Sequence, residues 1–130
     1  MMEVSSGYYR TKDGEWGIVY LDHILLGNRE LIELVLPKSI PEDTKSNVIH
    51  CQSNLLTELV IPEGIKTVYC SSNRLTKLEL SDSVGFLACR HNNIKELVVP
   101  KSVRRVLCDI NTELIPKTEF NENIIIQRYV

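Results

Sequence analysis

Hydrophobic residues recur along the chain at a fixed interval. Cys51, Cys70, Cys89 and Cys108 follow one another at a constant interval of 19 in the numbering. Asparagine follows at the third position after each cysteine, and apolar residues follow at offsets of five, eight, ten, fourteen and seventeen. These columns hold Asn54, Asn73, Asn92 and Asn111; Leu56, Leu75 and Ile94; Leu59, Leu78 and Leu97; Ile61, Leu80 and Val99; Ile65, Val84 and Val103; Val68, Leu87 and Val106. The pattern predicts similar units that bury their apolar faces against one another.

The repeated region spans about residues 21–116 and contains about five units. The first unit places Leu26 in the cysteine column, but the interval from Leu26 to Cys51 is six longer than the period. The excess falls in the segment PEDTKSN, residues 41–47, so we expect a loop insertion there. After Asn111 the pattern shortens. We therefore expect one domain over the whole chain, residues 1–130.

Both ends of the stack need a different structure because the end units lack one neighbour. Residues 1–20 contain Asp13 followed by Gly14, a dipeptide typical of tight turns, so we expect a β-hairpin cap. The segment IIIQRYV lies within residues 117–130, which we expect to form a closing cap strand.

The pattern predicts one short strand in each unit, which ends at the cysteine column. Successive side chains of a strand point to opposite faces, so Val68 and Cys70 face the core while Tyr69 faces outward. We expect the strands of neighbouring units to pair in parallel. The asparagine after each strand is expected to bond to buried backbone groups of its own and the neighbouring turn. The rest of a unit is too short for an α-helix and contains a proline in three copies, at Pro37, Pro62 and Pro100, so extended or 3₁₀ segments are expected.

Residues 65–75 read IKTVYCSSNRL and residues 84–94 read VGFLACRHNNI. Both match the pattern L-x-x-L-x-L-x-x-N-x-L, and the chain therefore resembles a leucine-rich repeat protein. The resemblance implies a solenoid of the α/β type that is mostly β. Parallel strands would line its concave face, and extended or 3₁₀ segments its convex face.

The connecting segments VIPEGI and VVPKSV are similar to those of short bacterial leucine-rich repeats. Comparable repeats occur in type III effectors, in bacterial surface proteins, and in phage and giant-virus proteins. Because 130 residues leave no room for a ubiquitin-ligase domain, we do not expect the ligase activity of the effectors.

The charge balance argues against a general binder of nucleic acid. The chain has 15 Lys and Arg residues against 17 Asp and Glu residues, a net charge of −2, whereas phosphate-backbone binders are usually basic. No apolar run approaches the length that spans a membrane, and no secretory signal is visible at the N-terminus. We therefore expect a cytoplasmic protein without membrane contact.

The cysteines and histidines do not predict a catalytic or metal site. One cysteine per unit places the sulfur atoms in a line, and no pair has the close spacing of zinc ligands. His50 precedes Cys51 and points to the opposite face, which excludes a Cys–His nucleophile pair. We find no phosphate-binding loop, nucleophile motif or paired carboxylates. We therefore expect no enzyme activity and no cofactor.

The outward positions of the strands are more informative. The predicted register places Val48, Tyr69, Phe86 and Leu107 in an apolar strip, with His50, Arg90 and Arg105 at its border. An apolar patch with an arginine-containing rim is typical of protein interfaces. The sequence therefore indicates a non-catalytic module that binds a partner protein as an adaptor or inhibitor, through His50, Tyr69, Phe86, Arg90, Arg105 and Leu107.

Other interpretations stay open. The apolar strip could be incidental, and residues 41–47 or an end cap could be the binding site instead. Arg104 and Arg105 with Arg90 and His91 form a small basic cluster, so association with nucleic acid is a weaker alternative. The end strands have pairing edges, which allows either a monomer or a weakly self-assembling protein. The sequence does not identify the partner, the organism or the pathway.

Overall fold

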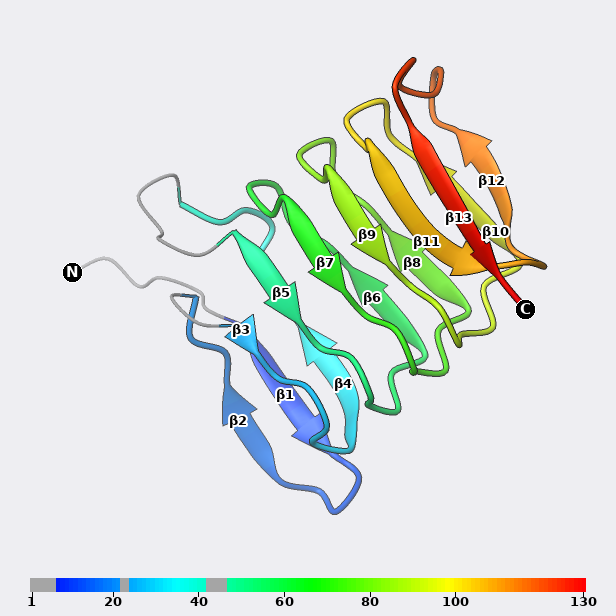
Figure 1. Ribbon diagram of the computed structural model, residues 1–130. Coiled ribbons are helices and arrows are strands. Elements are labelled where there is room, and N and C mark those ends of the chain that lie inside the picture. The colour runs from blue at the N-terminus through cyan, green and yellow to red at the C-terminus, as the bar shows by residue number, and fades with distance from the viewer. Residues whose placement is uncertain (1–6, 22–23, 42–46) are drawn as a thin grey trace.

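The computed structural model describes residues 7–21, 24–41 and 47–130. The chain is a mostly β solenoid that winds through about four turns before a closing strand (Figure 1). Each turn contributes one strand to a continuous six-stranded parallel sheet, here called the front sheet, and one strand to a second layer behind it, the back layer. No α-helix or 3₁₀-helix occurs in the described residues, so the connecting segments are extended.

The front sheet has the strand order β13-β11-β9-β7-β5-β3. Its strands are β3 (Ile24–Leu25), β5 (Val48–His50), β7 (Thr67–Tyr69), β9 (Phe86–Ala88), β11 (Arg105–Asp109) and β13 (Ile125–Tyr129). All the pairs are parallel, and β5, β7, β9 and β11 pair in register one repeat interval apart, as the sequence predicts. β3 pairs with β5 across the longer interval that contains the insertion, and the register of β13 on β11 exceeds the repeat interval by one.

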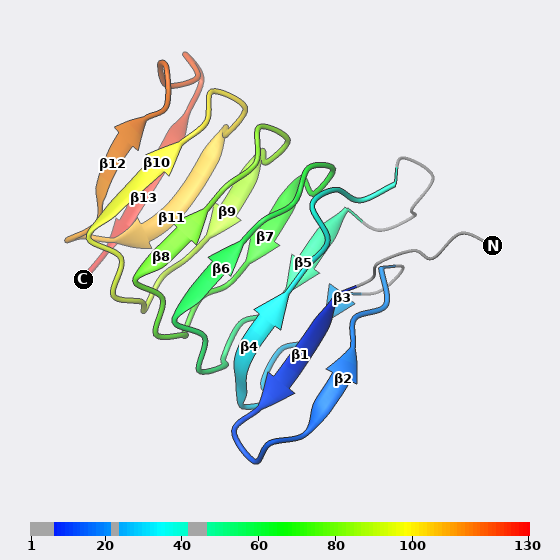
Figure 2. The same cartoon turned by 180° about the vertical axis from the view of Figure 1, so that it is seen from behind.

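The back layer consists of three hydrogen-bonded groups of strands (Figure 2). Their orders are β2-β1-β4, β6-β8 and β10-β12. The strands are β1 (Tyr8–Thr11), β2 (Trp16–Ile18), β4 (Leu31–Val35), β6 (Glu58–Val60), β8 (Lys77–Glu79), β10 (Glu96–Val99) and β12 (Glu113–Pro116). Pairing is therefore interrupted between β4 and β6 and between β8 and β10, whereas the front sheet is continuous.

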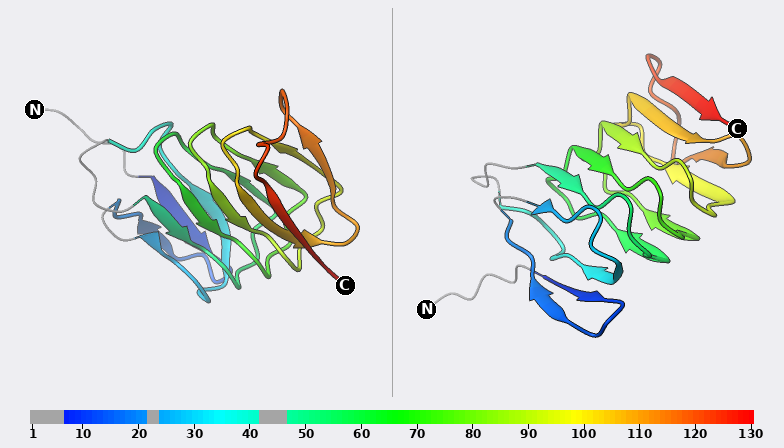
Figure 3. Two further views of the ribbon diagram at one scale, coloured as in Figure 1. Left: turned by 45° about the horizontal axis from the view of Figure 1, so that its top comes forward. Right: turned by 60° about the horizontal axis from the view of Figure 1, so that its bottom comes forward.

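The two layers lie face to face (Figure 3). The core between them consists of the predicted apolar columns. On β7, Val68 and the following Cys70 are fully buried, while Tyr69 between them is half-buried on the outer side. On β6, Leu59 is buried between the exposed Glu58 and Val60. The alternation on β7 and β6 explains why a short repeat can supply a strand to each layer and still close a core.

An asparagine ladder joins the turns that follow the front strands. Asn73 accepts a hydrogen bond from the Leu56 N–H (3.0 Å) and donates to the carbonyl oxygens of Cys51 (3.0 Å) and Cys70 (3.1 Å). Asn54 and Asn92 make the same kind of contacts one turn away on either side. Each side chain therefore links its own turn to the preceding one.

The fourth column position does not continue this ladder. Asn111 is exposed, and the next residue, Thr112, is buried and donates its hydroxyl to the Ile94 carbonyl oxygen (2.9 Å). The expectation for Asn111 is therefore wrong. The strand that precedes it, β11, runs on to Asp109, and the shortened turn brings the neighbouring residue inward.

At the N-terminal end, β1 and β2 form an antiparallel hairpin, and β1 also pairs antiparallel with β4. The hairpin thus extends the back layer by two strands beyond the first turn. Tyr9 packs against the core and its ring lies over Gly17, a position where a Cβ atom would overlap that ring.

At the C-terminal end, β13 is the edge strand of the front sheet and puts Arg128 in the cysteine column. The Arg128 guanidinium donates to the Thr112 carbonyl oxygen (2.6 Å) and lies 3.9 Å from the Cys108 sulfur. The line of buried cysteines therefore ends at a charged residue.

Candidate interaction surface

The outer side of the front sheet, here called the front face, carries three columns of outward side chains. The columns are Val48, Thr67, Phe86, Arg105 and Ile125; Leu25, His50, Tyr69, Ala88, Leu107 and Gln127; and Gly27, Gln52, Ser71, Arg90, Asp109 and Tyr129. These are the columns that the repeat predicts, extended by one strand. The same spacing assigns His23 to the head of the first column, and this residue lies outside the described residues.

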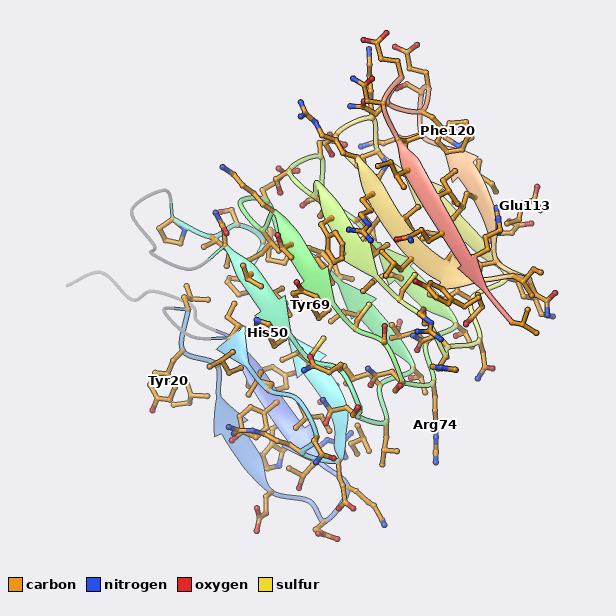
Figure 4. All side chains as sticks on the ribbon, in the orientation of Figure 1. Tyr20, His50, Tyr69, Arg74, Glu113 and Phe120 are labelled. Carbon is orange, nitrogen blue, oxygen red and sulfur yellow. The ribbon has the colours of Figure 1, made fainter. Side chains whose placement is uncertain are left out.

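Aromatic side chains from three neighbouring strands pack together on this face. The rings of His50 and Tyr69 are stacked, with their centroids 4.8 Å apart and their planes at 9° (Figure 4). Phe86 follows on β9, 5.5 Å from the Tyr69 ring and tilted by 49°. All three are half-buried. Because the ring faces contact one another, this row presents ring edges and polar ring atoms to an approaching molecule.

Arg105 continues the row onto β11. Its guanidinium carbon lies 5.8 Å from the Phe86 ring centroid, and its Nε and Nη2 atoms donate to Gln127 Oε1 at 3.0 and 2.6 Å. The structure therefore brings His50, Tyr69, Phe86 and Arg105 together in one line across four strands. We call these four residues the aromatic row.

Arg90 belongs to a different part of the front face. Its guanidinium lies over the Tyr129 ring, 3.6 Å from the centroid, and its backbone N–H donates to the Ser71 hydroxyl (3.1 Å). Leu107 is half-buried and pairs with Ala88 on one side and Gln127 on the other. Arg90 and Leu107 thus lie on the predicted face but not in the aromatic row.

Sequence reasoning missed two residues that hold the arginines, Gln127 and Tyr129. Both lie on β13, where Gln127 pairs with Leu107 and Tyr129 with Asp109, so this register exceeds the repeat interval by one. The apolar run of residues 124–126 indicates a strand, but it does not fix this offset. The loop insertion at 41–47 is described only at its ends, residues 41 and 47.

Acidic residues are nearly absent from the front face. Along its described columns Asp109 is the one acidic residue, and its carboxylate accepts the backbone N–H groups of His91 (2.8 Å) and Asn92 (3.1 Å). Arg90, Arg105 and His50 share this face. Acidic residues outnumber basic residues in the whole chain, but the front face carries more basic than acidic side chains.

The four cysteines are buried, as predicted, and none forms a disulfide. Burial raises the pKa of the Cys51 thiol to about 12, and burial together with the neighbouring thiols Cys51 and Cys89 raises the pKa of Cys70 well above its ordinary value. These thiols are therefore neutral at physiological pH. Within residues 7–21, 24–41 and 47–130, no cluster of three or more His, Cys, Asp or Glu side chains has a geometry that could hold a metal ion.

Comparisons with known proteins found no relative of the chain. No family model, no curated protein and no solved structure matches the chain. In the described part of the chain, no helix is long and apolar enough to cross a membrane.

Proposed function

We propose that the chain is a leucine-rich repeat protein that binds a partner protein through the front face. The repeat motif, the parallel strands and the asparagine ladder support this family. The proposed module has no catalytic activity of its own and acts as an adaptor or inhibitor by covering a surface of its partner. It works in the cytoplasm.

The aromatic row is the observation that carries this proposal. It is a contiguous line of half-buried aromatic side chains that ends in an arginine, and it lies on a face with one acidic residue among the described positions. Aromatic residues and arginine are enriched at the centres of protein interfaces, whereas Asp, Glu and Lys are depleted.

The packing within the row also favours binding. His50, Tyr69 and Phe86 restrain one another, and Gln127 restrains Arg105, so these side chains lose little freedom when a partner docks. A partner segment that lies across the strands would bury the ring edges of all three aromatic residues. Its hydrogen-bond acceptors would meet Arg105 and the Tyr69 hydroxyl.

The test is capture of partners from a lysate of the source organism, followed by mass spectrometry. The test variant combines Tyr69→Ser with Arg105→Glu. The control variant combines Val98→Ser with Lys95→Glu, a matched apolar-to-polar and charge-reversing pair on or beside β10, where both side chains are exposed. We expect a protein that wild type and control retain and that the test variant loses at least tenfold.

Equal retention by both variants would contradict binding through the aromatic row. Circular dichroism of each variant verifies that the fold is kept. A nuclease treatment of the lysate tests the alternative, association with nucleic acid. If the captured material is lost after nuclease treatment and its retention falls steeply with salt, the partner is a nucleic acid.

A further inference from the structure

The outer side of the back layer carries a second apolar patch, near the N-terminal end. Ile18, Tyr8 and Val35 are direct cross-strand partners on β2, β1 and β4, and Val60 follows on β6. Their exposed fractions are 59%, 39%, 39% and 58%, and the neighbouring Trp16 is 64% exposed. We call these five residues the back patch. All five are exposed, whereas His50, Tyr69 and Phe86 of the aromatic row are half-buried.

A groove of about 400 Å³ crosses the back patch between β4 and β6, and Val35 and Val60 are among the residues that line it. No backbone hydrogen bond joins residues 32–36 to residues 57–61, although the two strands are neighbours. The groove therefore combines apolar side chains with strand edges that have no backbone partner across it. Because β4 and β6 have Cα atoms within 8 Å of one another, a short segment of another chain would lie over the groove and bury its side chains there, without inserting as a strand between them.

Acidic side chains surround the groove. Glu33, Glu58 and one basic residue, Arg10, line it, and Glu79 lies on the next strand, β8. Arg10 is already paired with Glu33 (3.5 Å) and lies 5.5 Å from the Trp16 ring centroid. Across the back layer as a whole, the strands carry five glutamates against Arg10 and Lys77. The strands of this side therefore carry more acidic than basic side chains.

We propose that the back patch binds a short apolar segment of another protein that carries lysine or arginine. The row of Ile18, Tyr8, Val35 and Val60 buries the apolar side chains of the segment, and its basic side chains meet Glu58 and Glu79. Charge complementarity selects this occupant. An anionic membrane or a nucleic acid would be repelled by the glutamates, and two copies joined patch to patch would bring their glutamates together.

The back patch does not overlap the front face, so selecting peptides that bind to the chain tests it separately. A display library of random short peptides is panned on the full chain, and enriched peptides are resynthesised with a fluorescent label. Their affinity is measured by fluorescence anisotropy at low salt and again at a salt concentration several times higher. We expect enriched peptides with several apolar residues and at least one Lys or Arg, and we expect weaker binding at the higher salt.

Matched variants locate the binding site. Val60→Gln and Glu58→Lys should each weaken these peptides at least fivefold. Val98→Gln and Glu96→Lys, the same changes at exposed positions on β10 outside the patch, should change binding less than twofold. Three outcomes would overturn the proposal. The enriched peptides could lack basic residues, the two variant pairs could weaken binding equally, or the Tyr69→Ser/Arg105→Glu variant could lose binding. The proposal would also fail if no peptide were enriched. It would fail likewise if the chain associated with itself or bound to neutral lipid vesicles and Val60→Gln abolished that association or binding.

Discussion

At the residue scale, each asparagine of the ladder bonds to backbone groups of two successive turns. Replacing Asn73 by alanine leaves the buried Leu56 N–H unpaired and removes a donor from two carbonyl oxygens. Since each unsatisfied buried group costs roughly 1–3 kcal/mol, we expect Asn73→Ala to lower the free energy of unfolding by about 2–4 kcal/mol. Urea denaturation followed by circular dichroism measures this loss.

The exposed Asn111 is the matched control for that substitution. It stands in the same sequence column, but Asn111→Ala should change the unfolding free energy by less than about 0.5 kcal/mol, as is usual for exposed positions. Equal losses for the two variants would contradict the role of the ladder.

The buried thiols make stability depend on pH. Because the pKa of Cys51 is raised to about 12 in the folded chain, its thiol stays neutral at about pH 10.5, whereas the unfolded thiol, with its ordinary value of 9.0, ionises. The unfolded state then binds fewer protons, so stability is complete below about pH 9 and falls as the pH rises above it. For Cys51 alone the loss at about pH 10.5 is about 2 kcal/mol.

Urea denaturation at neutral pH and at about pH 10.5 tests this. Cys51→Ala lacks the thiol, so the stability difference between wild type and variant should shrink by about 2 kcal/mol at the higher pH. A difference that stays constant would show that the thiol ionises equally in both states.

At the element scale, the front strands could be predicted because a single repeat determines both their spacing and their register. Tyr69 outward and Cys70 inward follow from alternation once the cysteine column is recognised. The partners of β1 could not be derived in this way. Its pairing with β4 is antiparallel and depends on tertiary packing, so nothing in the repeat predicts Trp16 and Ile18 on the outside of the back layer.

The hairpin is tied to the core through Tyr9, whose ring occupies the space above Gly17. A methyl group at position 17 would push the outer end of this ring aside. We therefore expect Gly17→Ala to lower the free energy of unfolding by about 1–3 kcal/mol in urea denaturation, the usual cost of overpacking.

Gly85, which directly precedes β9, offers a control. A Cβ atom there would find its nearest neighbour, the Lys66 carbonyl oxygen, at 3.8 Å, which is an ordinary contact. Because none of the strongly destabilising mechanisms applies there, Gly85→Ala should change the free energy of unfolding by less than about 0.5 kcal/mol. If Gly17→Ala were equally harmless, the hairpin would not depend on Tyr9 for its attachment.

At the scale of the whole molecule, the exposed sheet edges decide whether copies associate. Three features oppose edge pairing: β3 has two residues, β12 ends at Pro116, and β13 carries the inward-pointing Arg128. Short strands, proline and inward charges are the devices that prevent edge-to-edge association. We therefore predict that the chain stays monomeric well into the micromolar range, which sedimentation velocity measures.

Arg128 is the residue that should matter most for this behaviour. Val106 and Cys108 are the inward residues of β11, and Ile126 and Arg128 are their counterparts on β13. Replacing Arg128 by valine would make both inward positions of the edge strand apolar, like those of the strands before it. The open end would then resemble an interior turn that lacks its neighbour, so Arg128→Val should associate in a concentration-dependent way.

Arg128→Lys keeps the charge and should stay monomeric. A wild type that already associates at low micromolar concentration, or a folded Arg128→Val variant that stays monomeric, would show that this charge does not protect the edge.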